Sequence, residues 1–299
     1  MTRRGWILFA AMGVIWGIPY LFIKIAVGEL TPASLVFLRT AIGAALLLPI
    51  AAARKDLGPL LPHWRWIVVY TFVEVAAPWF LLSDAERRIS SSLSGLLIAL
   101  VPSISAVLAW ATGSDDRLDL RRILGLGLGF LGVIALVGLD VGATDVGAVG
   151  EVALVALGYA LGALIIARKL SSLPLFGVVA ASLALTMVAY APVGVAQLPP
   201  AMPSARVVLA VVVLGVVCTA LAFLLFLPLV AEVGAARATV ITYVNPAVAL
   251  ALGVAVLGEP LTFGIALGFV LIVLGSVLAT RRSPPAKPSV ALARSPDLL

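Results

Sequence analysis

The stretch YVNPAVALALGVAVLGEP, residues 243–260, decides the fold class of this chain. It is apolar enough for a membrane interior, yet Asn-Pro interrupts it at 245–246 and Gly-Glu-Pro ends it at 258–260. Proline removes a helical N–H and frees a carbonyl, so such a helix must pack on protein or line a cavity. A similar passage, LVPSISAVLAWATGSDD, occupies residues 100–116. The sequence therefore predicts broken membrane helices at two related positions.

The composition is that of an integral membrane protein. Of the 299 residues, 63% are hydrophobic and 11% are charged, and the mean hydropathy is +1.19. Soluble domains are about half apolar and about a quarter charged. The apolar runs are continuous over roughly 20 residues, which favours membrane helices over the alternating strands of a barrel. We therefore expect an all-α membrane protein.

Ten spans are predicted from the apolar runs. They cover residues 5–27, 32–53, 64–83, 89–111, 120–138, 148–168, 174–196, 206–231, 234–257 and 261–280. The N-terminus has the order of a signal peptide, but its apolar run is long and no small-residue cleavage site follows. We interpret it as an uncleaved first helix, and we expect the Pro-rich residues 283–299 to be a disordered cytoplasmic tail.

The distribution of charge predicts the orientation in the membrane. The net charge of +6 comes from residues in short loops and at both ends, which argues against nucleic-acid binding. The predicted outer segments carry only Arg87, Arg88 and Arg206, whereas the inner segments carry most of the other basic residues. This bias and the even number of spans predict a multi-pass protein of the cell (inner) membrane with both termini in the cytoplasm. One cysteine, Cys218, and one loop histidine, His63, predict no disulfide, metal site or cofactor.

Spacings along the chain indicate an internal repeat. Pro102 and Pro246 are 144 residues apart, and Trp16 and Tyr159 are 143 apart. Two halves, residues 1–142 and 143–282, would each contain five spans. An odd number of spans turns the second half over in the membrane, which is the inverted-repeat design of secondary transporters. The predicted fold is ten transmembrane helices in two inverted five-helix repeats.

A family resemblance rests on the second repeat. Its segment VGAARATVITYVNPAVALALGVAVLGEPLTFG resembles the end of an EamA-type half in the drug/metabolite transporter superfamily. Trp16-Gly17, Arg39 and SSLSGLLIALVPSISAVLAW also match, over residues 5–280 in all. The first half departs from the family, with GSDDRLDLRR where a Gly-Glu step is usual. The resemblance implies a ten-helix bundle with a central cavity that moves small metabolites, commonly outward.

Arg39 and Glu74 are the principal candidates for a substrate site, because charge inside a membrane is costly without a partner or water. Both are predicted to lie roughly 10 to 13 Å deep, given the helical rise of about 1.5 Å per residue. The repeat matches them to Ala181 and Cys218, so neither charge is required by the fold. Two interpretations remain open. Either they form a structural ion pair, or Arg39 holds a substrate carboxylate and Glu74 binds a substrate amine or a coupling proton.

Three aromatic residues and one amide complete the predicted site. Trp16 and Tyr20 are four residues apart on one face of the first span, and Tyr159 matches Trp16 in the repeat. They are interpreted either as walls of a cavity for an amphipathic or aromatic solute or as helix packing. Asn245 either contacts substrate or satisfies the kink at Pro246.

Several other features are assigned to structure. Pro102 is expected to kink the fourth span, with Ser103 and Ser105 satisfying the freed backbone. Glu259 is expected to cap the last span. The pairs Gly125/Gly129 and Gly264/Gly268 predict close helix packing, within the bundle or between protomers, and the oligomeric state stays open.

Charged residues at the outer ends of the spans are discounted as site residues. Lys24 and Glu29 are placed near the outer interface, where a lysine can snorkel. Glu86 is placed with Arg87 and Arg88 in a solvated loop.

The predicted function is export of small amino-acid-like or amphipathic solutes across the lipid bilayer by alternating access, with proton coupling left open. An intramembrane enzyme is disfavoured, since the chain has no H-E-x-x-H motif. Its single His and single Cys cannot build a metal site or a Cys-His dyad within the bilayer. A nucleotide-driven pump is disfavoured by the absence of a G-x-x-x-x-G-K-[ST] motif. A lipid-carrier flippase or a passive facilitator on the same fold remains the alternative.

Overall fold

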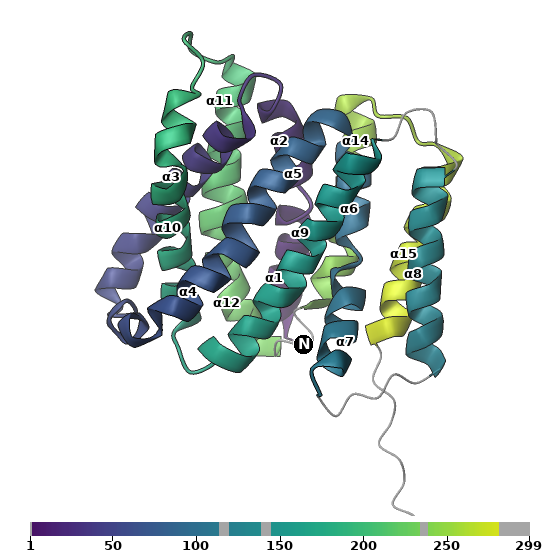
Figure 1. Cartoon of the computed structure of the whole chain (residues 1–299), viewed down its shortest axis with the longest axis horizontal. Helices are drawn as coiled ribbons and strands as arrows, with labels where there is room; N and C mark the ends of the chain where they lie inside the picture. Colours follow the sequence, from purple (N-terminus) through teal and green to yellow (C-terminus); the bar gives the residue numbers. More distant parts are fainter. Residues whose placement is uncertain (1, 114–119, 139–144, 234–238, 281–299) are drawn as a thin grey trace, which may run out of the picture.

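The computed structural model describes residues 2–113, 120–138, 145–233 and 239–280, and every regular element in these ranges is a helix (Figure 1). The first half forms α1 (Arg3–Ile15), α2 (Pro19–Ala26), α3 (Pro32–Ala53), η1 (Gly58–His63), α4 (Trp64–Tyr70), η2 (Thr71–Ala76), α5 (Ala77–Arg88), α6 (Ser91–Ile98), α7 (Val101–Ala111) and α8 (Leu120–Gly138). The second half forms α9 (Val146–Ile165), η3 (Ile166–Leu170), α10 (Leu175–Ala196), α11 (Ala205–Val212), η4 (Val213–Leu221), α12 (Ala222–Val233), η5 (Thr239–Tyr243), α14 (Asn245–Leu257) and α15 (Phe263–Thr280). The segments η2, η3 and η4 are π-helical, and η1 and η5 are 3₁₀ turns.

Eight helical stretches of the described chain are long and apolar enough to cross a membrane. They are Arg3–Ala26, Pro32–Ala53, Gly58–Arg88, Ser91–Ala111, Val146–Leu170, Leu175–Ala196, Ala205–Val233 and Phe263–Thr280. Residues Ile241–Leu257 form a shorter apolar helix, and α8 occupies the predicted fifth span. The prediction of an all-helical membrane protein is confirmed. The exact count of ten spans and the division into two repeats stay predictions, and the tail lies outside the described residues.

The described helices break at prolines. Pro19, Pro102 and Pro246 each stand in the first turn of a helix that follows a short break. A proline costs least there, because the first N–H groups of a helix have no intrahelical partner. The first predicted span is thus two helices, α1 and α2, rather than one, and they meet at residues 16–18.

The break before α7 is stabilised from the other half of the chain. Ser276 Oγ on α15 donates to the carbonyl oxygen of Ala99 at 2.7 Å and lies 3.2 Å from Ser103 Oγ. The prediction that Ser103 and Ser105 satisfy the freed backbone locally was wrong. The physical reason is that a hydroxyl from a facing helix can reach the break directly.

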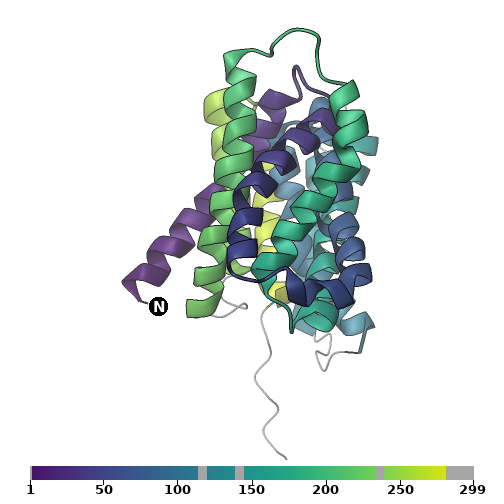
Figure 2. The ribbon, with the colours of Figure 1, turned by 90° about the vertical axis from the view of Figure 1, so that its left-hand side faces the viewer.

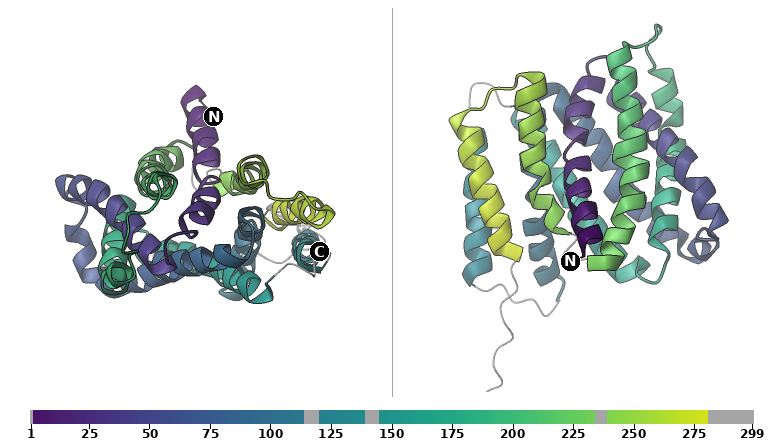
Figure 3. Two further views of the ribbon diagram at one scale, coloured as in Figure 1. Left: turned by 90° about the horizontal axis from the view of Figure 1, so that it is seen from above. Right: turned by 180° about the vertical axis from the view of Figure 1, so that it is seen from behind.

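Helices α8 and α15 lie side by side at one edge of the molecule (Figures 1 and 3). A Cβ atom at Gly275 would lie 2.5 Å from Gly129 N and 2.6 Å from Gly125 O. A Cβ atom at Gly132 would lie 3.0 Å from the backbone nitrogen of Ile272. The small residues therefore let two backbones touch within the bundle.

The N-terminal part of α1 leans away from the neighbouring helices (Figure 2 and the left panel of Figure 3). Its side chains Trp6 and Ile7 are 59% and 61% exposed. Its inner side packs on α12, where Thr2 Oγ1 is hydrogen-bonded to Glu232. Large apolar side chains exposed in this way fit contact with lipid.

At the opposite end of the bundle, an ionic cluster joins α5 to α9. Arg88 contacts Asp84 at 2.8 Å, Asp145 at 3.2 Å and Glu151 at 2.5 Å. Asp145 also caps α9, because its side chain accepts a hydrogen bond from Ala148 N at 3.0 Å. That backbone hydrogen bond holds the pKa of Asp145 below its ordinary value.

Asp145→Asn is expected to lower the melting temperature at pH 7 by about 1–2 °C, since exposed ion pairs contribute little. Asparagine keeps the cap and removes the charge. A carboxyl whose pKa is lowered by folding stabilises the protein above its unfolded pKa, and this contribution is lost as the pH falls through the folded value. The difference in melting temperature between the two proteins should therefore shrink as the pH falls below the unfolded pKa of aspartate, and disappear below the lowered folded pKa. A difference that persists there would contradict the assignment.

Candidate functional site

Arg39 lies in the interior of the bundle on α3 and is only 7% exposed. Its Nε donates to Thr219 Oγ1 at 3.1 Å, and its guanidinium carbon lies 3.6 Å from the centre of the Trp79 ring. Thr219 Oγ1 in turn donates to the carbonyl oxygen of Leu214, inside the π-helical segment η4. The orientation of Arg39 is thus fixed by one hydrogen bond and one aromatic face.

The terminal nitrogens of Arg39 have no hydrogen-bond partner within the described part of the chain. No ion pair joins Arg39 to Glu74, although both residues are described. Of the two interpretations left open, the structural ion pair is therefore not seen among the described residues. Similar depth in the membrane did not bring the two charged groups within ion-pair distance. Arg39 is therefore a buried cation whose two NH₂ groups can donate hydrogen bonds to an anion.

Glu74 lies in η2 and faces α9. One of its oxygens, Oε2, is buried without a hydrogen-bond partner among the described residues. The side chain packs directly on Gly162, where any larger residue would meet it. Tyr70 and Tyr159 are within electrostatic range of its carboxyl.

Tyr20 and Tyr159 flank this region. Tyr20 is 6% exposed and packs on Gly95 of α6, and Tyr159 packs against two apolar clusters, one containing Tyr20 and the other containing Trp79. Each tyrosine is within electrostatic range of the other and of Arg39. The structure therefore brings Arg39, Tyr20 and Tyr159 together, and Glu74 is in electrostatic range of Tyr159.

Trp16 belongs to a different cluster. It lies at the break between α1 and α2, and its ring contacts Phe223 and Phe226 of α12, with centroids 6.1 and 4.7 Å away. The prediction that Trp16 and Tyr20 share one face of a continuous helix was wrong, because the helix breaks between them. A direct contact of Trp16 with substrate stays a prediction.

Asn245 joins the start of α14 to α1. Its amide nitrogen lies 3.0 Å from the carbonyl oxygens of both Ile241 and Gly13 in the orientation that satisfies the amide. These contacts satisfy backbone groups at the break before Pro246. They agree with the kink interpretation of Asn245, and contact with a substrate stays a prediction.

Glu259 caps a helix of the other half of the chain. Its Oε1 accepts from Ser91 N at 2.7 Å, and its Oε2 accepts from Ser92 N at 3.0 Å and from Ser92 Oγ at 2.5 Å. It therefore caps α6, whereas Thr262 Oγ1 accepts from Ile265 N at the start of α15. The prediction that Glu259 caps the last span was wrong. The cause is that the loop after α14 folds over the adjoining end of α6.

Glu86 and Lys24 also differ from their predicted places. Glu86 is fully buried on α5, since this helix continues to Arg88 and leaves no loop at 84–88. Lys24 Nζ donates to the carbonyl oxygens of Glu86 at 2.5 Å and Ile89 at 2.8 Å instead of extending to the interface. A lysine that binds the last carbonyls of a helix stabilises its C-terminal end.

Sequence reasoning missed Trp79, Thr219 and Glu86. Trp79 gave no clear signal, because it is four residues from the outer end of the predicted span 64–83, where an interfacial tryptophan is expected. Thr219 adjoins Cys218, the repeat partner of Glu74, but its bond to Arg39 depends on the packing of α3 on η4. Glu86 had no local signal.

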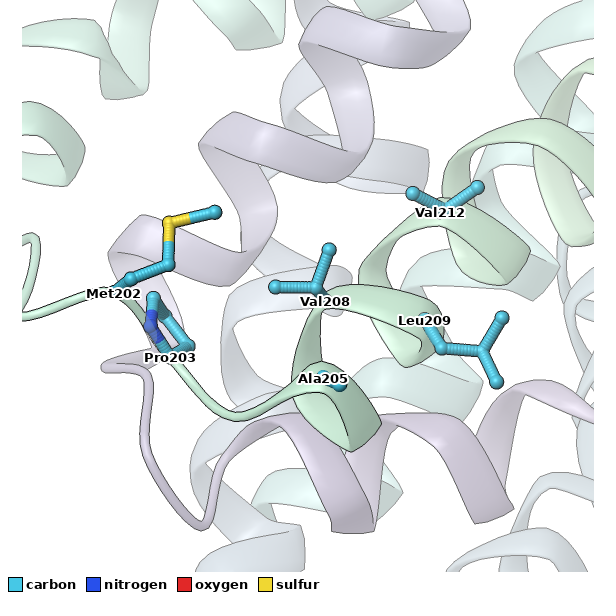
Figure 4. A pocket seen from close by; sticks show the side chains of 6 residues that line it. All are labelled: Met202, Pro203, Ala205, Val208, Leu209 and Val212. Atoms are coloured by element: carbon cyan, nitrogen blue, oxygen red, sulfur yellow. The ribbon is translucent and has the colours of Figure 1, made fainter.

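One hollow on the surface does not coincide with this site. It measures about 510 Å³, and Figure 4 shows its six apolar lining residues at the start of α11, among them Met202, Val208 and Val212. It offers no polar side chain to orient a solute. Its exposed position on the bundle fits contact with lipid.

Eight apolar helices long enough to cross a membrane define the described chain as a multi-pass membrane protein. Comparison with known families makes this specific. The model of the EamA-like transporter family matches residues 3–138 and again 149–281. The chain belongs to this family and is a membrane transporter.

Relatives agree over nearly the whole chain. The "Uncharacterized transporter YvbV" of Bacillus subtilis (strain 168) is 24% identical over 287 residues, 94% of this chain and 93% of that protein. An "Uncharacterized transporter" of Archaeoglobus fulgidus is 24% identical over 291 residues, 93% and 99% of the two chains. A solved crystal structure, 22% identical, covers 94% of this chain and 97% of its own with a TM-score of 0.67, which shows a shared fold.

Proposed function

We propose that this transporter carries small, amino-acid-like or amphipathic solutes and exports them by alternating access. The observation that carries the proposal is the buried guanidinium of Arg39, whose terminal nitrogens have no partner in the described part of the chain. An unpaired buried cation is unfavourable, so its retention favours an anionic group that arrives with the solute. A carboxylate matches the two parallel N–H donors of a guanidinium.

The neighbouring groups suit the rest of such a solute. Glu74, with one oxygen unpartnered, would bind a substrate amine or a coupling proton. Tyr20 and Tyr159 would form walls between the two charged ends, while Trp16 and Asn245 border the helix breaks nearby. Opposite charges at the two ends of such a site would fit a zwitterion.

The arrangement also supports two inverted repeats of five spans, residues 1–142 and 143–282. The family matches the chain twice, once in each half. The π-helical segments η2 (71–76) and η4 (213–221) occupy equivalent positions in the two halves and hold Glu74 and Thr219. Wide turns of this kind are frequent at functional sites. We propose that the site lies between these segments, in an inner-membrane protein with both termini cytoplasmic.

Counterflow in proteoliposomes tests this function. Vesicles are loaded with a mixed panel of unlabelled amino acids, and the entry of each labelled amino acid is followed. Saturable exchange of at least one zwitterionic solute is expected. Flux without saturation would instead indicate a passive facilitator. Absence of exchange, together with movement of a labelled lipid carrier between leaflets, would indicate a flippase.

A further inference from the structure

Glu86 is the most completely buried carboxylate of the described chain that has no evident structural role. It is 0% exposed, and neither of its side-chain oxygens has a hydrogen-bond partner among the described residues. Ser91 Oγ, in the first turn of α6, is also buried without a partner among the described residues. Most buried polar groups are hydrogen-bonded, so these two exceptions require an explanation.

The surroundings of Glu86 determine which form of the carboxyl can exist there. An ionised carboxylate buried without a hydrogen bond or a counter-ion is strongly unfavourable, whereas the neutral acid is tolerated. The acid form is therefore the form that fits this closed arrangement. Opening of the surrounding helices would hydrate the group and let the proton leave to water.

Charged and titratable groups from several helices surround Glu86. Lys24 of α2, Arg39 of α3 and Glu259 after α14 are the charged groups in electrostatic range. Tyr20 of α2 and Tyr159 of α9 are also in range, and α6 contributes only hydroxyl groups. Lys24 is held by the carbonyl oxygen of Glu86 itself, at 2.5 Å. A cation is thus available to stabilise the carboxylate once the proton has left.

The same end of the bundle is closed by contacts between the two halves of the chain. Glu259 holds the first turn of α6, and Gly253 of α14 packs against Ser91, Ser92 and Glu259. Separation of α6 from α14 would break these contacts. It would also open the surroundings of Ser91, whose backbone N–H binds Glu259, and of Glu86, which is in electrostatic range of Glu259.

We propose that Glu86 binds the proton that this transporter exchanges for its solute, and that opening of the α6–α14 contact releases that proton to water. This inference rests on the proposed function and assigns the coupling proton to Glu86, which leaves Glu74 for the substrate amine. The step is balanced: a carboxylate and a proton form a carboxylic acid when this end closes, and the acid returns the proton to the aqueous phase when it opens.

Proton binding is tested without any substrate by infrared difference spectroscopy of the protein in lipid, titrated across the neutral range. The wild type is expected to show the C=O band of a protonated carboxyl group, which disappears as the pH rises. Glu86→Gln should lose this band, and Glu86→Asp should retain a titrating band. A band that is unchanged in Glu86→Gln, or that is lost in Glu74→Gln instead, would overturn the proposal.

Coupling is tested with a solute that shows counterflow. With one proton per solute, a gradient of one pH unit drives about tenfold accumulation in acid-loaded vesicles. Glu86→Gln is expected to exchange solute but to accumulate it only to a ratio of about one. The control is Glu29→Gln, an exposed carboxylate at the same end that accepts from Ser204 N.

The two tests fail separately. If no solute exchanges, the proposed function fails while the infrared titration still decides whether Glu86 binds a proton. If Glu86→Gln accumulates solute like the wild type, Glu86 is not the coupling group.

Discussion

Arg39→Ala is expected to lose saturable exchange of amino-acid-like solutes. Removing one partner of a buried, hydrogen-bonded charge pair costs about 2–5 kcal/mol, which corresponds to a loss of affinity of roughly 30-fold or more. Arg39→Lys should be intermediate, because lysine keeps the charge but loses the stack on Trp79 and the planar pair of donors. The measurement is counterflow as a function of solute concentration, which separates the apparent affinity from the maximal rate.

The control variant is Arg54→Ala. Arg54 also lies over an aromatic ring, 4.6 Å from the centre of Phe176, but it is exposed at the N-terminal end of the bundle. Its removal should leave the apparent affinity unchanged. The melting temperature of Arg39→Ala should not fall greatly, since the substitution removes a buried charge that lacks an ionic partner. Exchange by Arg39→Ala with the affinity of the wild type would remove the carboxylate role from Arg39.

Gly275→Leu is expected to prevent recovery of folded protein. The new side chain would begin 2.5 Å from Gly129 N and 2.6 Å from Gly125 O, and backbone atoms of a packed helix cannot rotate away as a side chain can. Overpacking of a well-packed interior typically costs about 1–3 kcal/mol, and a clash with backbone lies at or beyond the upper end. The expected result is loss of the monodisperse peak in detergent, or a melting temperature lower by at least about 5 °C.

Gly127→Leu provides the matched control on α8. No atom lies within 4 Å of a Cβ atom placed at Gly127, so the leucine would point into open space. This variant should purify and melt like the wild type. If Gly275→Leu did so too, α8 and α15 would not be in backbone contact in the protein.

The fold class could be predicted from the sequence because it depends on local properties of the chain. An apolar run of about 20 residues must become a membrane helix, since lipid offers no partner for backbone N–H and C=O groups. A proline removes one helical N–H, so the breaks before α7 and α14 could be expected at Pro102 and Pro246, although Pro49, Pro192 and Pro228 lie inside helices. The motif that resembles the family is also continuous in sequence, at residues 233–264.

Part of the candidate site could also be predicted from the sequence. Arg39 stands out in any sequence as a charge inside a span, and its burial follows from the cost of exposing it to lipid. The residues that contact Arg39 could not be predicted from the sequence. Thr219 is 180 residues away, and the bond between them depends on the rotation of two helices about their axes. The sequence suggested Glu74 instead, since depth in the membrane can be counted but rotation cannot.

The tertiary structure alone decided what the carboxylates at the closed end contact. From sequence, Glu259 looked like a cap for the helix that follows it, and Glu86 looked like part of a solvated loop. In the fold, Glu259 binds Ser91 and Ser92 from the other half, and Glu86 is buried with neither side-chain oxygen hydrogen-bonded to a described residue. The physical reason is the separation along the sequence over which each interaction acts. Hydropathy and backbone hydrogen bonding act within a few residues, whereas a buried side chain is satisfied by whichever helix packing brings to it.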